Sequence, residues 1–524
     1  MASRKVKGST ASLVRQGSAW LLQRSFLFLR VVAFSFLLIG TGFAEEASPD
    51  TAQVQGPPSP YEPLPSDQPS AGTNESSTVF KPIRNWWNDT HSWETGAGRS
   101  YVLPVGEILL YQFLLNLYDR NFVEPTSDYD TDWDTIWDHI TDPHWVVDND
   151  QFAVNQFLHP YGGSIYYGLA RSSGLNFWES FLYSVGGSYV WELAGETTNP
   201  SINDMVATPI GGTFLGEPFF RMASLILEDA EGKPGFWREL GAAVIAPPLG
   251  FNRLVFGNKF DAIFPSHKPA TFMRLQAGGT LSSSSRNVSS GVEENGAVAD
   301  FTFTYGLPGK PGYTYKRPFD YFDFHVRAVT ANLVESINSR GLLLGAPYAA
   351  GESTRGIWGL YGSYDYISPQ VFRVSSTALS LGTTWQTWLS RTVALQGTAL
   401  AGGGYGAAGS IEKTGERDYH YGMTPQGLLS LRLIFGDRVM LDFTGREYYV
   451  SNTLSTENGW ENILRADSSL TLRVYDRHGV AVRYSYSHRD AKYSDIAYKD
   501  QTVGTVSLMY VFLGETKFGA VEWR

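Results

Sequence analysis

The C-terminal half of the chain alternates between apolar and polar positions over short segments separated by turns. Residues 464–474, 480–487 and 505–512 show this best, because one parity is apolar and the other polar. Successive side chains of a strand point to opposite faces, so each segment predicts a strand with one apolar face. We predict twelve strands, which begin near Thr271, Val298, Phe319, Glu335, Arg355, Arg373, Thr392, Gln426, Arg438, Glu461, Val480 and Thr502.

The connections between these strands switch between short and long. Turns at Ser390-Arg391, 436–438 and 476–479 are short, whereas the polar connections at 406–424, 451–460 and 489–501 are long. Short periplasmic turns, long outer loops and an even strand number are typical of bacterial outer-membrane barrels. We therefore expect residues 266–524 to form a membrane β-barrel of about 12 antiparallel strands. A soluble all-β protein, the alternative, would need a second sheet to cover so many apolar faces.

Strand parity also predicts which side chains face the lumen. Leu470, Leu472, Val482 and Leu508 lie on the apolar parity and should face lipid. Arg473 and Arg483 lie on the polar parity and should face the lumen. The nearest Ser/His/Asp grouping of the barrel is Ser485, Ser487, His488 and Asp490, but Ser487 and His488 have opposite parity and cannot share one site.

Residues 81–265 have apolar positions at helical spacing instead. Asn176 followed by Glu179 predicts a capping box at the start of one helix. These helices are too short or too interrupted to span a bilayer. We expect an N-terminal α-helical domain that is packed in or under the barrel, periplasmic or within the lumen. Its helices are predicted at 105–118, 163–172, 177–196, 212–229 and 236–246.

The N-terminal 80 residues predict export. Residues 1–44 contain no acidic residue, and a basic stretch precedes an apolar run and a small-x-small site at Gly42–Ala44, so we expect a secretory signal peptide. An uncleaved inner-membrane anchor and a mitochondrial transit peptide are the alternatives. Residues 45–80 are rich in proline and predict a disordered linker.

The composition of the chain limits which kinds of partner and site we expect. The formal net charge of −11 argues against nucleic acid. The chain has no cysteine, which excludes disulfides, thiolate metal sites and a cysteine nucleophile. We expect outer-membrane lipid and the barrel-assembly machinery as partners, and no cofactor.

Ionisable residues are concentrated on the otherwise apolar helical segment. Glu192 and Glu196 are four residues apart and share a helix face. With His159 as general base and Arg171 steadying an oxyanion, they have the chemistry of a hydrolase. His159 with Glu192 and Glu196 is also a possible metal site, although no HExxH spacing is present. Structural pairing of buried charges is the alternative. The candidate catalytic cluster is His159, Arg171, Glu192, Glu196, Asp204 and Glu217.

The same region resembles a bacterial family known as domain of unknown function 3943. The likeness runs from about Phe152 to Arg221 and lies in the segments His159-Pro160-Tyr161, Ala170-Arg171, Trp191-Glu192, 200–204 and 215–217. It implies an exported envelope protein and brings no assigned reaction. The sequence thus predicts an outer-membrane barrel with a structural or gated-passage role and a plug-like helical domain. An envelope lipid or ester hydrolase that uses the His/Glu cluster is the alternative, and the sequence leaves open whether the protein is an enzyme.

Overall fold

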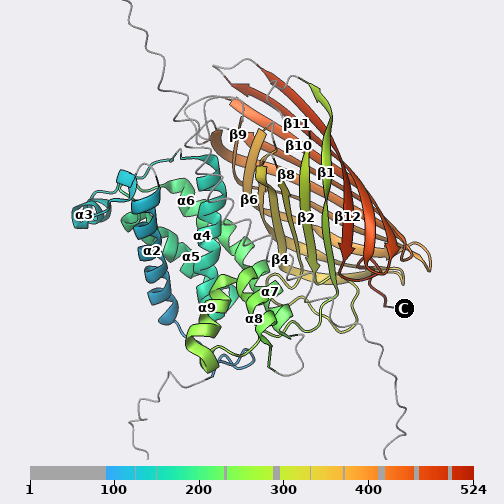
Figure 1. Cartoon of the computed structure of the whole chain (residues 1–524), viewed down its shortest axis with the longest axis horizontal. Coiled ribbons are helices and arrows are strands. Elements are labelled where there is room, and N and C mark those ends of the chain that lie inside the picture. Colours follow the sequence, from blue (N-terminus) through green and yellow to red (C-terminus); the bar gives the residue numbers. More distant parts are fainter. Residues whose placement is uncertain are drawn as a thin grey trace, which may run out of the picture.

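The computed structural model has a helical domain followed by a β-barrel (Figure 1). It describes residues 90–123, 126–148, 150–228, 233–286, 295–330, 332–369, 372–410, 419–451, 453, 459–493 and 498–523. The predicted signal peptide and linker lie outside the described residues. The helices are α2 (Leu103–Phe122), η1 (Thr126–Tyr129), α3 (Trp133–Thr141), η2 (Val154–Leu158), α4 (His159–Ser172), α5 (Phe177–Ala194), α6 (Ile202–Val206), η3 (Ala207–Gly211), α7 (Gly212–Glu228), α8 (Phe236–Ile245), α9 (Pro247–Phe256) and η4 (Gly257–Lys259).

Twelve antiparallel strands close into one barrel, which confirms the predicted architecture. Each strand pairs with its sequence neighbours, and β1 pairs with β12 to close the ring. The strands are β1 (Thr271–Arg286), β2 (Asn295–Tyr305), β3 (Phe322–Val329), β4 (Asn332–Ala350), β5 (Thr354–Ile367), β6 (Phe372–Trp388), β7 (Val393–Ser410), β8 (Tyr419–Phe435), β9 (Val439–Ser451), β10 (Gly459–Tyr475), β11 (His478–Tyr493) and β12 (Lys499–Leu513).

The predicted parity agrees with the exposure of the strands. Leu470, Leu472, Val482 and Leu508 are exposed on the outer wall. Arg483 is buried in the lumen and pairs with Asp300. Arg465–Glu335 and Arg274–Asp442 also join distant strands across the lumen, and further buried pairs join adjacent strands: Arg327–Glu335, Arg340–Asp365 and Arg489–Glu461.

The chain after β12 turns back into the mouth of the barrel. Phe518 is fully buried, and Gln386 and Gln396 donate from the wall to the carbonyl oxygens of Val521 and Gly519, both at 2.7 Å. Residues 514–523 therefore close the end of the barrel where β1 begins. Sequence patterns do not indicate this segment, because it is short and lacks strand alternation.

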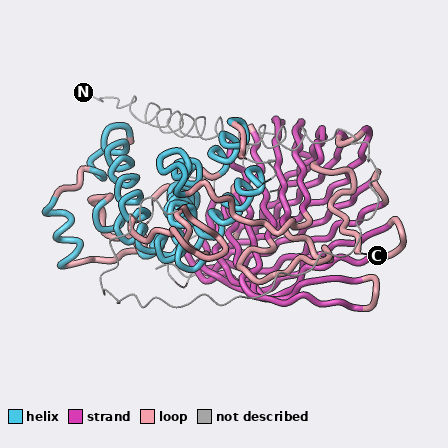
Figure 2. The backbone as a smooth tube through the Cα atoms, turned by 90° about the horizontal axis from the view of Figure 1, so that it is seen from below, coloured by secondary structure: helices cyan, strands magenta, loops and turns pink. Residues whose placement is uncertain are grey.

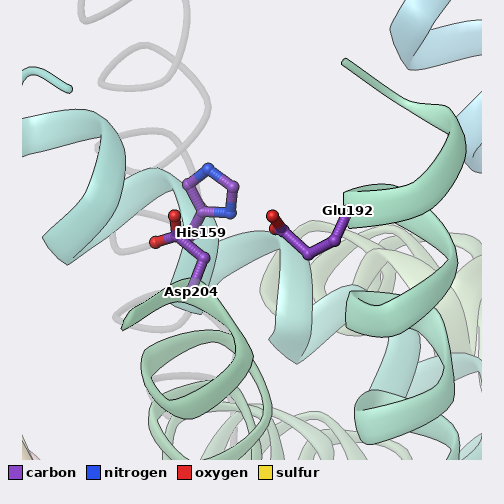
Figure 3. A group of neighbouring side chains, drawn as sticks. All are labelled: His159, Glu192 and Asp204. Carbon is purple, nitrogen blue, oxygen red and sulfur yellow. The ribbon is translucent and has the colours of Figure 1, made fainter. Parts of the chain in front are cut away.

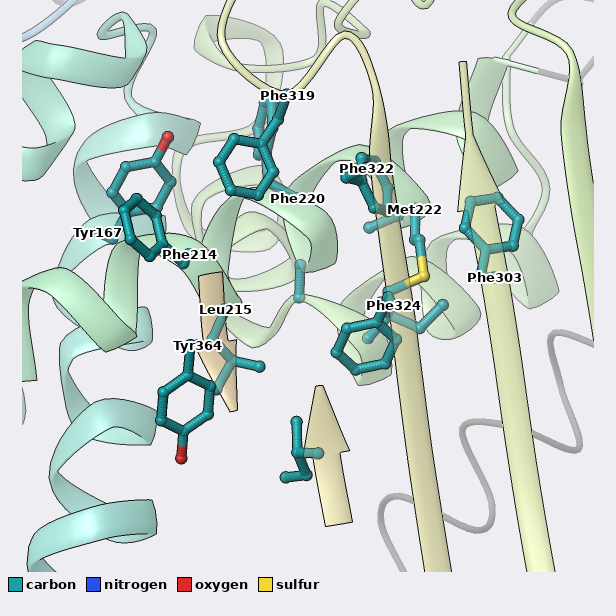
Figure 4. Packing of buried hydrophobic residues seen from close by; sticks show 14 of the residues in the cluster. Tyr167, Phe214, Leu215, Phe220, Met222, Phe303, Phe319, Phe322, Phe324 and Tyr364 are labelled. Carbon is teal, nitrogen blue, oxygen red and sulfur yellow. The ribbon is translucent and has the colours of Figure 1, made fainter. Parts of the chain in front are cut away.

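The helical domain packs against the outer wall of the barrel, beside the strands (Figures 1 and 2). Phe214 of α7 stacks on Phe319 at 6.0 Å, and its carbonyl oxygen accepts from Ser339 of β4. Tyr364 of β5 donates to the Gln156 carbonyl at 2.6 Å. Ser339 and Tyr364 have the parity of exposed Trp358, opposite to lumen-facing Asp365. The contacts therefore differ from the expected packing in or under the barrel: an aromatic cluster fills the seam between α7 and the wall (Figure 4).

Two strands, β3 and β8, begin at other residues than the sequence predicted, near Phe319 and Gln426. The long 306–321 connection carries Phe319 and Asp320, which contact the helical domain. β8 begins at Tyr419, seven residues before its predicted start, because Tyr419 and Tyr421 extend the strand to contact the helices. Both departures therefore serve the docking of the helical domain.

Candidate functional site

Two short π-helical turns shape the polar site of the helical domain. η2 leads directly into His159 at the start of α4, and η3 follows α6, which carries Asp204. π-turns interrupt the regular helical ladder and are frequent at functional sites. Ser201 caps α6 by accepting from the Asp204 backbone N–H at 3.2 Å. This cap turns Asp204 toward α4 and α5.

His159, Glu192 and Asp204 converge from three helices (Figure 3). One side-chain ligand atom from each lies within 4.8 Å of the other two. Glu192 Oε2 accepts from the Ser201 backbone N–H at 2.7 Å, and the Asp204 side chain accepts from Asn203 Nδ2 at 3.3 Å. Asp204 Oδ1 is buried and has no hydrogen-bond partner among the described residues. The site thus holds an acceptor that nothing satisfies.

Glu196 lies beside this group but is already occupied. Its two carboxylate oxygens accept from Trp191 Nε1 at 2.9 Å and from Thr198 Oγ1 at 3.1 Å. Asp148, which the sequence analysis did not single out, adds a further carboxylate; its oxygens accept from the Asp150 N–H and from Asn155 Nδ2. Asp148, His159 and Glu196 are partly exposed, whereas Glu192 and Asp204 are buried.

Neighbouring carboxylates dominate the electrostatics around His159, Glu192 and Asp204. Burial together with the nearby Asp204 raises the pKa of Glu192 to about 9. Burial alone would lower the pKa of His159, but Asp204, Glu196 and Glu192 raise it to about 9. Burial and the Asp204 charge raise the pKa of Asp148 to about 7. Groups that stay protonated near neutral pH are suited to acid–base chemistry.

Hydrogen bonds fix the site to the barrel wall. Tyr421 of β8 accepts at its hydroxyl from Asn203 Nδ2 at 2.8 Å and from Asn155 Nδ2 at 3.2 Å. Asn203 also accepts from the Asp148 backbone N–H at 2.8 Å. The barrel therefore positions two of the segments that carry site carboxylates.

Arg171 and Glu217 belong to a separate buried network. Glu217 accepts from Arg171 Nε at 2.9 Å, from Arg221 Nε at 2.7 Å and from Tyr167 OH at 2.6 Å. Arg221 also reaches Asp320 in the β2–β3 connection at 2.9 Å. The structure thus brings together His159, Glu192, Glu196 and Asp204 and places the other two predicted residues in this docking network. Arg171 is held there by Glu217, so the oxyanion role expected for it has no geometric support.

Sequence reasoning missed Asp148, Arg221 and Asp320. Arg221 lies four residues after Glu217, so helical spacing was a signal that could have identified the pair. Asp148 and Asp320 lie on irregular segments, where spacing does not predict which groups meet.

Solved barrels were compared with this chain. It is similar to the TodX deltaS2S3 mutant monoaromatic hydrocarbon channel at 9% identity, covering 48% of this chain and 92% of that one, with a TM-score of 0.20. It is similar to the translocator domain of autotransporter NalP from Neisseria meningitidis at 16% identity, covering 46% and 86%, with a TM-score of 0.22. These TM-scores are low, so the fold assignment rests on the closed strand order. No curated protein matches the chain.

The helical segment around the site matches a family model. The match covers residues 144–248, which include α4 to α8 and the six candidate site residues. It confirms the resemblance found in the sequence. Residues 144–248 are therefore similar to the family described as domain of unknown function DUF3943.

Proposed function

We propose that this protein is an outer-membrane enzyme whose barrel is an anchor and whose helical domain, set into lipid beside the barrel, hydrolyses a lipid ester. The observation that carries the proposal is the polarity of α2 and α5, which is inverted relative to a water-soluble helix. Each buries polar or small side chains and exposes large apolar ones. A site on such a domain meets lipid rather than dissolved substrate.

α2 shows this inversion most clearly. Glu107 and Gln112 are buried, whereas Phe113 and Leu114 are 63% and 53% exposed. In water such exposure would be unfavourable by about 25 cal/mol for each Å² of apolar surface. Contiguous exposed apolar surface marks an interaction site, and α2 carries it on the side of the helical domain that faces away from the barrel (Figure 1).

α5, which carries Glu192, repeats the pattern. Its inward face consists of Ser180, Ser184, Gly187 and Ser188, which are buried, whereas Leu182 is 65% exposed. Small inward residues let helices approach closely, as in helices packed within lipid. No described helix meets the length and hydropathy of a membrane-crossing span. We infer that the domain is immersed as a unit against the barrel.

The barrel interior supports an anchor rather than a passage. Ion pairs cross the lumen, and residues 514–523 close one end of it. A lumen cavity lined by Thr304, Asp323, Arg340 and Arg432 measures only about 60 Å³. A solute would have to break several buried charge pairs, each costing several kcal/mol.

The site can perform ester hydrolysis with its own residues. The carboxylate of Asp204 takes a proton from water while the water oxygen attacks the ester carbonyl carbon. Protonated His159 or Glu192 then gives its proton to the leaving alkoxide as the carbon–oxygen bond breaks. The products are a carboxylic acid and an alcohol.

Lipid contact is tested with nitroxide labels, which the absence of cysteine makes straightforward. Leu114→Cys and Leu182→Cys, labelled in refolded protein in lipid vesicles, should collide more with oxygen than with a water-soluble nickel chelate. Arg438→Cys, in an exposed turn of the barrel, is the aqueous control. Greater nickel than oxygen accessibility at both helical positions would refute immersion.

Hydrolysis is tested with His159→Asn and Glu192→Gln. Both should lose release of fatty acid from outer-membrane lipid vesicles while keeping heat-modifiable barrel mobility. Glu107→Gln, which neutralises a buried carboxyl of the same domain outside the site, is the matched control. Full activity in both folded site variants would refute the enzyme proposal.

A structural role in the envelope is the second candidate, favoured by the Arg171–Glu217–Arg221 network. That network joins the helical domain to the β2–β3 connection, and its charged side chains are buried and paired with one another. If folded His159 and Glu192 variants retain function and Glu217 variants lose it, this role is supported.

A further inference from the structure

We propose that His159, Glu192 and Asp204 bind a divalent transition-metal ion of the Zn²⁺ class. This inference rests on the site of the proposed function and deepens it: with the ion bound, His159, Glu192 and Asp204 would be its ligands, and the proton transfers would fall to the neighbouring Glu196 and Asp148. It goes beyond a cluster of acidic residues in two respects: one ligand is an imidazole, and one carboxylate oxygen is buried without a partner.

The unpartnered oxygen is the first step of the argument. Asp204 is 1% exposed, and its Oδ1 has no hydrogen-bond donor among the described residues. A buried charged acceptor without a donor is more unfavourable than a neutral one. Because the ligand atoms of His159 and Glu192 lie within 4.8 Å of those of Asp204, a cation between them would satisfy it.

The supporting hydrogen bonds leave the right atoms free. Ser201 N–H binds Glu192 Oε2, and Asn203 binds Asp204 Oδ2, so each carboxylate is oriented through one oxygen while the other remains for a ligand. Such outer partners orient metal ligands in known sites. Glu196 uses both of its oxygens on Trp191 and Thr198, which makes Asp204 the better third ligand than Glu196.

The excess of carboxylates over cations around the site also favours a bound metal ion. Glu192 and Asp204 face a single imidazole, and Glu196 and Asp148 add negative charge nearby. Arg171 and Arg221 are held in the separate Glu217 network. Among the described residues around the site, His159 is therefore the cation that the carboxylates share, and a divalent ion would offset the excess.

The ligand set selects the class of ion. One nitrogen and two carboxylate oxygens suit zinc, which binds both at about 2.0–2.2 Å, better than calcium, which takes six to eight oxygens. Three protein ligands leave a fourth position open, as in catalytic zinc sites. His159, Glu196 and Asp148 are partly exposed.

The test measures metal binding apart from activity. Full-length protein, refolded in detergent and stripped with a chelator, is titrated with Co²⁺, whose visible absorption reports nitrogen and oxygen ligation, and then with competing Zn²⁺. The wild type should bind one Co²⁺ at this site. Asp204→Asn and Glu192→Gln should weaken binding by about tenfold or more, at unchanged heat-modifiability.

Two control variants sharpen the result. Glu107→Gln should bind as the wild type does. His488→Asn removes the imidazole of a second, half-exposed grouping with Asp490 and Asp500, and should also leave the Co²⁺ spectrum unchanged. A wild type without a Co²⁺ spectrum, or a spectrum lost in His488→Asn but kept in Asp204→Asn, would overturn the metal site.

The outcomes separate this inference from the proposed function. Co²⁺ binding in the wild type, together with full lipid hydrolysis in folded Glu192→Gln, would support the metal site and refute the proposed enzyme. Hydrolysis in metal-stripped protein, lost in Glu192→Gln, with no Co²⁺ spectrum in the wild type, would support the enzyme and refute the ion.

Discussion

Glu217→Gln should unfold or release the helical domain from the barrel wall. Glu217 is fully buried and shared by Arg171 and Arg221, which are 4% and 1% exposed. Arg221 would keep Asp320 and Arg171 would keep the Leu175 carbonyl oxygen, but a glutamine offers the two guanidinium groups one neutral acceptor oxygen in place of two charged ones. Breaking a buried pair by removing one partner costs about 3–5 kcal/mol. We expect a loss of that size.

The measurement is equilibrium denaturant unfolding of refolded protein, followed by the helical signal in circular dichroism. Asp130→Asn is the control, because the Arg120–Asp130 pair at 3.3 Å is largely exposed and should contribute less than about 1 kcal/mol. Arg171→Met combined with Glu217→Gln should cost less than the sum of the single changes, since no unpaired guanidinium then remains at Arg171. A cost for Glu217→Gln no larger than that for Asp130→Asn would refute the reasoning.

Four further predictions follow from particular residues. Burial would raise the pKa of Glu217, but Arg171 and Arg221 lower it from 4.5 to about 2. The stabilisation that this ionised carboxylate contributes should therefore be complete above pH 4.5 and be lost as the pH falls toward 2. Unfolding titrations should show this pH dependence in the wild type and not in Glu217→Gln. Leu472→Arg on the outer wall should cost about 2–4 kcal/mol in vesicle refolding titrations if it meets the bilayer midplane, whereas a negligible cost would contradict the lipid-facing parity. Tyr421→Phe should leave Asn203 without its wall partner, whereas Asn155 keeps Tyr419, and should lower hydrolysis with little change in barrel mobility; an unchanged rate would show that Tyr421 does not position the site. N-terminal sequencing of protein from separated membranes should give Glu45 in the outer membrane, whereas an intact Met1 would contradict the signal peptide.

The sequence predicted the barrel well because strand parity is a local signal. The exposed Leu470 and buried Arg483 lie where alternation placed them. The capping box of Asn176 and Glu179 is also local and is present. Docking of the helical domain on the outer wall was not predictable, since it depends on contacts such as Tyr364 to Gln156, which are more than two hundred residues apart.

The candidate site was predicted in part for the same reason. Glu192 and Glu196 share a helix, and helical spacing finds such pairs. Asp204 joins His159 only because two π-turns redirect the chain. Arg171 and Glu217 have the same residue types as catalytic groups, and composition does not separate an ion pair that ties two helices from a reactive one.

The segment that closes the barrel mouth also constrains the order of folding. Residues 514–523 follow β12 in the chain, and their partners Gln386 and Gln396 lie on the strands β6 and β7, across the ring. The tail can reach them only when the sheet has curved so that β12 lies opposite β6 and β7. We therefore expect the tail to bind as the ring closes, and an extension fused after it to hinder this step more than the formation of the strands.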